Sequence, residues 1–377
     1  MAVAWVQLGE TYTHLLPAVG APDSLAQDAF ERAFALDSTA TVLFHPIQIA
    51  LRRGDLDGAT RMLARFKSAQ PDSALLQHVE IMADCVRNGP NNVPWQQLGR
   101  TRPFPLLDAG FSLAAGGARP DCATRAFEEI LAVDTAANGA AEGRRWAALM
   151  GFVATRLARH NPRASAEAAA AIDTFNGRWK YGTSLYLFAG PIDSVMALRA
   201  RMLARADSAR YGPTYARLPY ALHLFELGMW KLHERDVGTA ESIAHVLLTR
   251  ADTTRSPTMD RLLAQSLTAR IALARGDTAL ALRILESLVP TRFPEVQVMW
   301  NEMAPGAGER ILLARLMLAR GDAARALAIA NVIDTRAAIH LFFVPESLDL
   351  RLQAAIALGD RRTESELRRR IVGLRMQ

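Results

Sequence analysis

Lysine is scarce in this chain of 377 residues: only Lys67, Lys180 and Lys231 occur among 44 basic residues, and the others are Arg. No Gly-Lys pair occurs, which excludes a P-loop lysine in its usual place. Arg in place of Lys, with abundant Ala, is typical of a GC-rich bacterial genome. We therefore interpret the net charge of +6 as a consequence of composition, and we expect no nucleic-acid partner.

Cysteine is almost absent, since Cys85 and Cys122 are the only two. Two cysteines in so long a chain do not make a disulfide framework, and we expect buried free thiols. The first residues lack the basic and apolar regions of a secretory signal, and no apolar run approaches the roughly 18 residues that span a bilayer. The sequence therefore predicts a soluble, cytoplasmic protein that does not contact a membrane.

Aromatic residues make up only 7% of the chain, and runs of alternating Val, Ile, Thr and Tyr are missing. Half of the residues are hydrophobic, and Ala, Leu and Arg, which favour helices, dominate the sequence. These features predict an all-α protein with ample material for a continuous core.

Internal periodicity appears as recurring Asp-Ser and Asp-Thr pairs. Their spacing is one or about two units of a repeat of roughly 34–45 residues. Short polar side chains of this kind end one helix and cap the next. The pairs begin at Asp37, Asp72, Asp134, Asp173, Asp207, Asp252 and Asp334.

A second mark is a Gly-Asp pair after a segment rich in Ala, Leu and Arg, found at Gly54, Gly276, Gly321 and Gly359. Gly adopts the left-handed conformation that closes a helix, and Asp then caps the next one. The small Ala281 and Ala326 follow two of these turns by the same interval, where close helix packing favours Ala. Each such site predicts a helical hairpin.

These residues resemble the tetratricopeptide repeat. The run Trp5-x-x-Leu8-Gly9-x-x-Tyr12, followed by Ala26, Phe30 and Ala33, is similar to the family's consensus, and a second unit matches at Gly54, Ala59, Leu63, Phe66 and Pro71. The resemblance implies a right-handed α-solenoid of about nine to ten hairpins. It covers 1–377 as one array, with clear repeats at 1–71 and 257–373 and degenerate repeats at 72–256.

The family takes peptides in a concave groove lined by the first helix of each repeat. Carried over to this chain, the inward positions are Val6, Glu10, Thr13, His14, Phe44, Gln48, Leu51 and Arg52. The Lys and Asn that clamp a terminal carboxylate in some members are missing at these positions. We expect a mixed groove for a protein or peptide partner, without a carboxylate clamp.

Catalytic motifs are incomplete throughout. His233-Glu234 lacks the second His of a zinc protease, and His78-Val79-Glu80 lacks the Pro-Cys-x-x-Cys of a zinc deaminase. Gly110–Ala114 approximates a serine-hydrolase elbow, but it ends in Ala and lies in a segment predicted as helix. Gly306-Ala307-Gly308 lacks the third Gly of a dinucleotide site. We therefore predict no catalytic residue, no metal and no cofactor.

The function expected is a non-catalytic scaffold for protein–protein interactions. The alternative is a C-terminal regulatory or sensor module of a bacterial signalling protein, because the segment 29–56 weakly resembles repeat regions of bacterial Ser/Thr kinases and transcriptional regulators. No polar capping helix precedes the first repeat, so a homodimer contact or an upstream domain is expected to cover it. By contrast, Arg361–Arg375 has the pattern of an ordinary capping helix.

Two turn-rich loops, 88–95 and 300–309, are either binding loops or neutral insertions. The sequence leaves both alternatives open, and it does not identify the partner.

Overall fold

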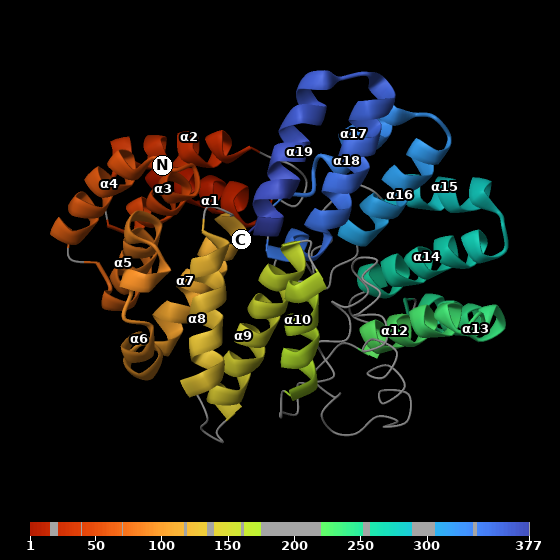
Figure 1. Ribbon diagram of the computed structural model, residues 1–377, viewed down its shortest axis with the longest axis horizontal. Coiled ribbons are helices and arrows are strands. Elements are labelled where there is room, and N and C mark those ends of the chain that lie inside the picture. The colour runs from red at the N-terminus through yellow and green to blue at the C-terminus, as the bar shows by residue number, and fades with distance from the viewer. Residues whose placement is uncertain are drawn as a thin grey trace. The chain divides into compact units, whose positions relative to one another are not determined.

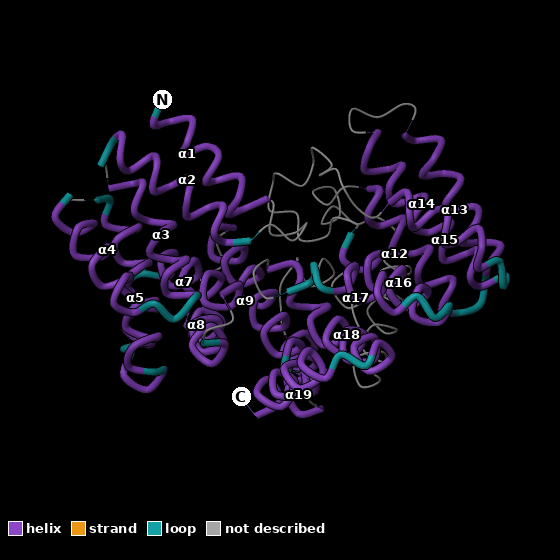
Figure 2. Tube along the Cα trace, turned by 90° about the horizontal axis from the view of Figure 1, so that it is seen from above, coloured by secondary structure: helices purple, strands orange, loops and turns teal. Residues whose placement is uncertain are grey.

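The structure is a computed structural model of the chain, and it describes residues 1–15, 22–38, 40–69, 71–116, 119–133, 139–159, 162–174, 220–251, 257–288, 306–334 and 338–376. Within these ranges every regular element is a helix and none is a β-strand, as Figure 1 and Figure 2 show. The all-α prediction is therefore confirmed for the described residues.

The chain divides into two compact units. Unit 1 comprises Met1–Ala171, Asp334–Leu341 and Leu374–Gln377, and unit 2 comprises Ile172–Ile333 and Phe342–Gly373. Each unit has helices and a core of its own.

Unit 1 is built from helices that pack against their neighbours in the chain and against their second neighbours. The second-neighbour contacts join α3 to α5, α5 to α7 and α7 to α9, so alternate helices form one layer. Its elements are α1 (Ala2–Glu10), a π-helical segment (Thr11–Leu15), α2 (Asp23–Leu36), α3 (Ala40–Arg52), α4 (Leu56–Ser68), α5 (Ser73–Asn88), a 3₁₀ turn (Pro90–Asn92), α6 (Trp95–Thr101), α7 (Pro103–Gly116), α8 (Pro120–Val133), α9 (Gly139–Ala158) and most of α10 (Pro162–Thr174).

Unit 2 repeats this pattern, with α12 contacting α14 and α16 contacting α18 across the intervening helix. One part of its core joins Leu263, Leu267 and Ile271 of α14 to small and branched residues of α12 and α13. The elements are α12 (Tyr220–His233), α13 (Val237–Ala251), α14 (Pro257–Ala274), α15 (Thr278–Leu288), α16 (Ala307–Ala319), α17 (Ala323–Ala330), α18 (Val344–Leu358) and most of α19 (Arg361–Met376). A 3₁₀ segment (Ala338–Phe343), most of which belongs to unit 1, precedes α18.

The Gly-Asp turns have the geometry that the sequence predicts. Each Gly has a positive φ, and each following Asp accepts a hydrogen bond from a backbone N–H in the first turn of the next helix. Asp277 also donates its own N–H to the carbonyl of Ala272, which satisfies an end group of the preceding helix at 2.8 Å. The φ values are 75° at Gly54, 82° at Gly276, 84° at Gly321 and 69° at Gly359.

The Asp-Ser and Asp-Thr pairs are less uniform. Asp72 caps α5 by accepting from the Ala74 N–H at 2.8 Å, as predicted. Asp37 ends α2, whereas Asp173 lies inside the last turn of α10. The pairs that begin at Asp134, Asp207 and Asp252 lie outside the described residues, as does Thr335 after Asp334.

Glycines inside helices admit large side chains from the neighbouring helix. Phe127 of α8 is fully buried between Gly110 of α7 and Gly151 of α9. A Cβ atom at Gly151 would lie 2.2 Å from Cζ of Phe127, so no other residue fits there without displacing the ring. Gly9 of α1 receives Phe30 of α2 in the same way.

We expect Gly151→Ala to lower the free energy of unfolding by about 1–3 kcal/mol, because overpacking a closed core forces side chains and backbone to shift. Gly143→Ala is the matched control, since it lies on the same helix and its Cβ would meet nothing within 4 Å. The control should be neutral or stabilising by up to about 1 kcal/mol, because Ala favours a helix more than Gly. Urea denaturation of both variants measures the difference, and equal midpoints would contradict the packing argument.

The two cysteines correct a prediction. Cys85 of α5 and Cys122 of α8 form a disulfide with their Cα atoms 6.2 Å apart, and both side chains are fully buried. The expectation of free thiols is therefore wrong, because the fold brings together two residues from different hairpins. Structural disulfides persist mainly in oxidising compartments, so the cysteines no longer support the expectation of a cytoplasmic protein.

The C-terminal helix α19 has the amphipathic pattern expected of a cap. Leu367 and Ile371 are buried, whereas Arg361 and Arg368 are exposed and pair with Glu364. None of the helices in the described ranges is long and apolar enough to cross a membrane.

Candidate functional site

A row of polar side chains crosses four helices of unit 1. It starts at Glu10, the last residue of α1, continues through His45 and Gln48 of α3 and His78 of α5, and ends at Ser112 of α7. We call these five residues the polar row. Of the helices that carry them, α3, α5 and α7 pack against one another in one layer of the unit, and Glu10 joins α1 to α3.

His45 joins Glu10 to Gln48. Its Nε2 atom lies 3.1 Å from Oε2 of Glu10, and its Nδ1 atom lies 2.6 Å from Oε1 of Gln48. Both ring nitrogens therefore lie within hydrogen-bond distance of a side-chain oxygen. His45 is buried, and its ring stacks on Phe30 of α2.

The far end of the row is organised around Ser112. Gln48 Nε2 donates to Ser112 Oγ at 2.9 Å, and Ser112 Oγ lies 3.0 Å from Nε2 of His78. The Gln48 amide nitrogen also lies 3.4 Å from His78 Nε2 and can only donate, so Nε2 is the acceptor and the His78 proton resides on Nδ1. The Ser112 hydroxyl therefore donates to His78.

Burial fixes His78 in its neutral form. Desolvation, with the nearby His45 as a second cause, lowers the pKa of His78 from 6.5 to about 3. A base with so low a pKa cannot take a proton from a serine hydroxyl near neutral pH, because effective general bases have a pKa near the working pH. No carboxylate of the described residues contacts His78. The Ser112–His78 pair thus lacks the features of a catalytic dyad.

Three of the eight expected groove residues meet at the polar row. Glu10 and Gln48 are members, and Phe44 packs edge-on against the rings of both His45 and His78, with ring centroids 5.0 and 4.9 Å apart. Phe44 and Gln48 are half-buried, and 35% of the Glu10 side chain is exposed. Charge, amide and aromatic groups are therefore available on one surface.

The remaining groove residues have other surroundings. Leu51 is in the core with 2% of its surface exposed, because its position on α3 turns it away from solvent. Arg52 donates to Asp23 of α2 at 2.8 Å, and Val6 packs against the cluster around Phe30. Thr13 has a buried hydroxyl, and the side chain of His14 lies outside the described residues.

Sequence reasoning missed His45, His78 and Ser112 as members of a site. A signal was present: Glu10 and His45 are 35 residues apart, His78 and Ser112 are 34 apart, and His45 and His78 are about one repeat apart. Residues one repeat apart occupy equivalent positions on successive inner helices. A single His or Ser on a helix carries no such signal, so the row emerges only when the repeat spacing is applied to all of them together.

No protein-family model matches this sequence, and no curated protein matches it either. The assignment of a function therefore rests on the geometry of the molecule.

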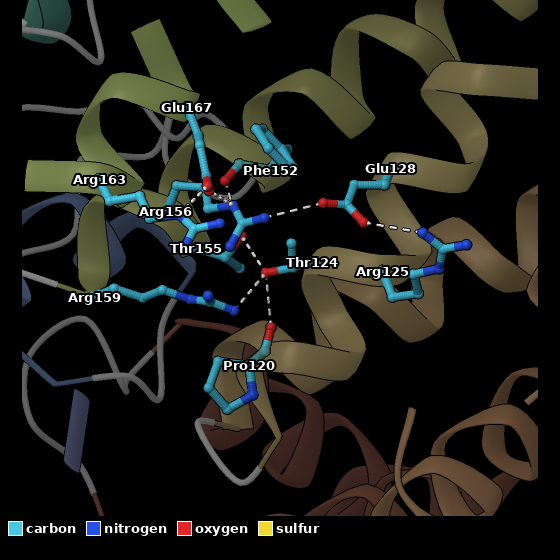
Figure 3. A network of polar contacts seen from close by, with 10 residues as sticks. All are labelled: Pro120, Thr124, Arg125, Glu128, Phe152, Thr155, Arg156, Arg159, Arg163 and Glu167. Carbon is cyan, nitrogen blue, oxygen red and sulfur yellow. Dashed lines mark hydrogen bonds and ion pairs between the residues drawn. The ribbon is translucent and has the colours of Figure 1, made fainter. Parts of the chain in front are cut away.

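A second polar cluster, drawn in Figure 3, lies on α8, α9 and α10 of unit 1. Arg156 bridges Glu128 at 3.0 Å and Glu167 at 3.1 Å, and Glu167 also pairs with Arg163. Arg159 extends toward Thr124, and burial beside Arg156 lowers the pKa of its guanidinium. The carboxylates here are all paired with arginines, so the cluster joins three helices and offers little to a ligand.

The two turn-rich loops differ in their surroundings. In loop 88–95, Trp95 Nε1 donates to the Pro90 carbonyl at 2.6 Å and Trp95 is buried, so the loop is held by its own side chain. Residues 300–305 of the other loop lie outside the described residues, and α16 begins at Ala307. No cluster of three or more potential metal ligands occurs in the described ranges.

Proposed function

We propose that this chain is a non-catalytic scaffold of tetratricopeptide type that holds a protein or peptide segment on its inner helices. The proposed architecture is a right-handed α-solenoid of about nine to ten hairpins, with the polar row and Phe44 on the partner-binding layer of unit 1. This surface has an accessible carboxylate at Glu10, an amide at Gln48 and an aromatic ring at Phe44.

The observation that carries the proposal is the repeat spacing of the polar row. Glu10, His45, His78 and Ser112 recur at about one repeat length on α1, α3, α5 and α7. The packing of α3 against α5 and of α5 against α7, with the Glu10–His45 contact between α1 and α3, supports a shared layer for these helices. Alternate helices of a stacked repeat line its concave surface, and such surfaces bind extended partners.

Binding is favoured over catalysis for a physical reason. The one nucleophile–imidazole pair of the row joins Ser112 to His78, whose pKa of about 3 leaves it without basic strength at neutral pH. Mutual hydrogen bonds occupy the row, which suits a rigid surface that is preorganised for a partner.

The second candidate is a regulatory module whose first hairpin docks another domain or a second copy of the chain. The observation that favours it is the exposure of apolar residues on α1: Val3 is 71% exposed and Leu8 is 36% exposed. Exposed apolar residues on one helix are typical of a contact surface.

Affinity capture from the host, followed by titration of the captured protein, tests the scaffold. We expect Phe44→Ala and Glu10→Gln each to lower the affinity for the captured partner by at least about tenfold, as truncation of an interface hot spot does. Arg61→Glu, at an exposed position of the outer helix α4, is the matched control and should retain wild-type affinity. Circular dichroism confirms that each variant is folded.

Three outcomes would go against the scaffold. If the wild type, Phe44→Ala and Glu10→Gln bind the captured protein with equal affinity, that protein does not bind at the polar row. Ester hydrolysis that is lost in Ser112→Ala would show a catalytic function. Self-association that is lost in Val3→Asp, with no partner captured, would favour the second candidate.

A further inference from the structure

Two residues of α7 in unit 1 are exposed, and they are next to each other on the helix. Phe104 has 56% of its surface exposed, and Asp108 is exposed one turn later. All other residues of 103–114 are buried or half-buried. Phe104 and Asp108 are therefore the part of α7 that a partner can reach.

These two residues continue the line of the polar row. Phe104, Asp108 and Ser112 follow one another at the four-residue interval that places side chains on one side of a helix. Ser112 accepts from Gln48 of α3 at 2.9 Å, so this side of α7 adjoins the polar row. The side chain of a helical residue leans toward the preceding turn, which brings Asp108 toward Phe104. The surface proposed for the partner thus extends along α7 to a carboxylate and an aromatic ring.

The carboxylate of Asp108 has no cation of its own. No hydrogen bond or ion pair within the described part of the chain involves its side chain. By contrast, Glu10 contacts His45 at 3.1 Å, and Asp23 pairs with Arg52 at 2.8 Å. Neighbouring protein atoms exclude part of the water around Asp108, and this desolvation raises the pKa of its carboxyl. The group is accessible and yet incompletely solvated, and a cation that binds to it would compensate the lost hydration.

The ring of Phe104 already packs against one basic side chain. Cζ of Arg144 on α9 lies 4.7 Å from the ring centroid. Arg144 is not the counter-ion of Asp108, because burial is the only cause that shifts the pKa of that carboxyl. The exposed part of the ring offers an apolar surface for the aliphatic stem of a further long side chain, whose charged head can reach Asp108.

We propose that Asp108 and Phe104 bind a basic side chain, Arg or Lys, of the segment that unit 1 holds. The carboxylate pairs with the charged head, and the ring packs against the stem. This inference rests on the scaffold function proposed above and adds the chemistry of the partner. The partner is a protein segment that carries a positive charge where it crosses α7.

A displayed library of random peptides, selected on the full chain, tests this assignment. Peptides that bind the wild type and do not bind Phe44→Ala are those that depend on the polar row, and we expect them to be enriched in Arg and Lys. Selection on Asp108→Arg should enrich Asp and Glu instead, because the reversed charge repels a basic side chain and attracts a carboxylate.

Fluorescence anisotropy of one enriched peptide measures the size of the effect. Asp108→Asn should lower its affinity about ten- to a hundredfold, as loss of a hydrogen bond between charged groups does. Replacing the basic residue of the peptide by Gln should have the same effect, and both changes together should cost no more than either alone, because they remove one contact. Asp57→Asn, which removes the same charge at an exposed position of the outer helix α4, is the matched control and should retain wild-type affinity.

Asp108 makes no internal contact that a substitution would break, so Asp108→Asn should fold as the wild type does, and circular dichroism checks this. If Asp108→Arg does not fold, Asp108→Asn decides. Equal affinity of the wild type and Asp108→Asn for the peptide, or Phe44-dependent peptides without an excess of Arg and Lys, would overturn the inference and would not affect the scaffold proposal. If no enriched peptide depends on Phe44, the scaffold proposal and this inference are both wrong.

Discussion

Removing the disulfide between Cys85 and Cys122 should lower the free energy of unfolding by about 4 kcal/mol. The bond closes a loop with a sequence separation of 37 residues, and the chain entropy that this removes from the unfolded state corresponds to that value. The bond joins α5 to α8, so the loss is expected in unit 1, where α5 also carries His78 of the polar row.

Single and double substitutions of the two cysteines distinguish a disulfide from two free thiols. Cys85→Ala, Cys122→Ala and the double variant should all lose about the same stability in urea denaturation, because either substitution breaks the one bond. If the thiols were free, each single substitution would lower the free energy of unfolding only slightly, and the loss in the double variant would equal the sum of the two. Thiol labelling of the unfolded wild type without reductant gives an independent check, and two labelled cysteines would contradict the disulfide.

Local chemistry makes the hairpin turns predictable. A Gly that needs a positive φ and an Asp that caps the next helix are adjacent in the sequence, so four turns can be located from the residues alone. A fifth turn of the same geometry, between α12 and α13, was missed because Arg235 takes the left-handed conformation there, with φ of 65°. Asp236 keeps the rest of the pattern: its N–H donates to the Lys231 carbonyl, and its side chain accepts from Thr239.

The candidate site was predictable only in part, because its contacts are not local. Glu10 and Gln48 were expected on the inner surface from their places in the repeat, and the structure puts both in the polar row. The residue that joins Glu10 to Gln48 is His45, and the repeat pattern did not predict it. The pattern predicted Leu51 and Arg52 on the inner surface instead, but Leu51 is buried in the core and Arg52 bonds to Asp23. Likewise, the pairing of the two cysteines depends on the packing of α5 near α8, which no single hairpin specifies.

Acid should destabilise this protein through His78. The unfolded chain binds a proton at this residue near pH 6.5, whereas the native state does not until about pH 3, where burial has placed the pKa. Below pH 6.5 the unfolded state therefore binds more protons, and the free energy of unfolding falls as the pH falls. The His78 contribution reaches a loss of about 2 kcal/mol at pH 5 and about 4 kcal/mol at pH 3.

His78→Gln separates this effect from the general loss of stability in acid. A Gln side chain can still bond to Ser112 and Gln48 but does not titrate, so the variant should lose about 2 kcal/mol less than the wild type between pH 7 and pH 5. His245→Gln, at an exposed position of α13, is the control and should keep the wild-type slope. Urea denaturation at several pH values gives the slopes. Parallel slopes for wild type and His78→Gln would show that the pKa of His78 is not lowered in the native state, and would contradict the argument from burial.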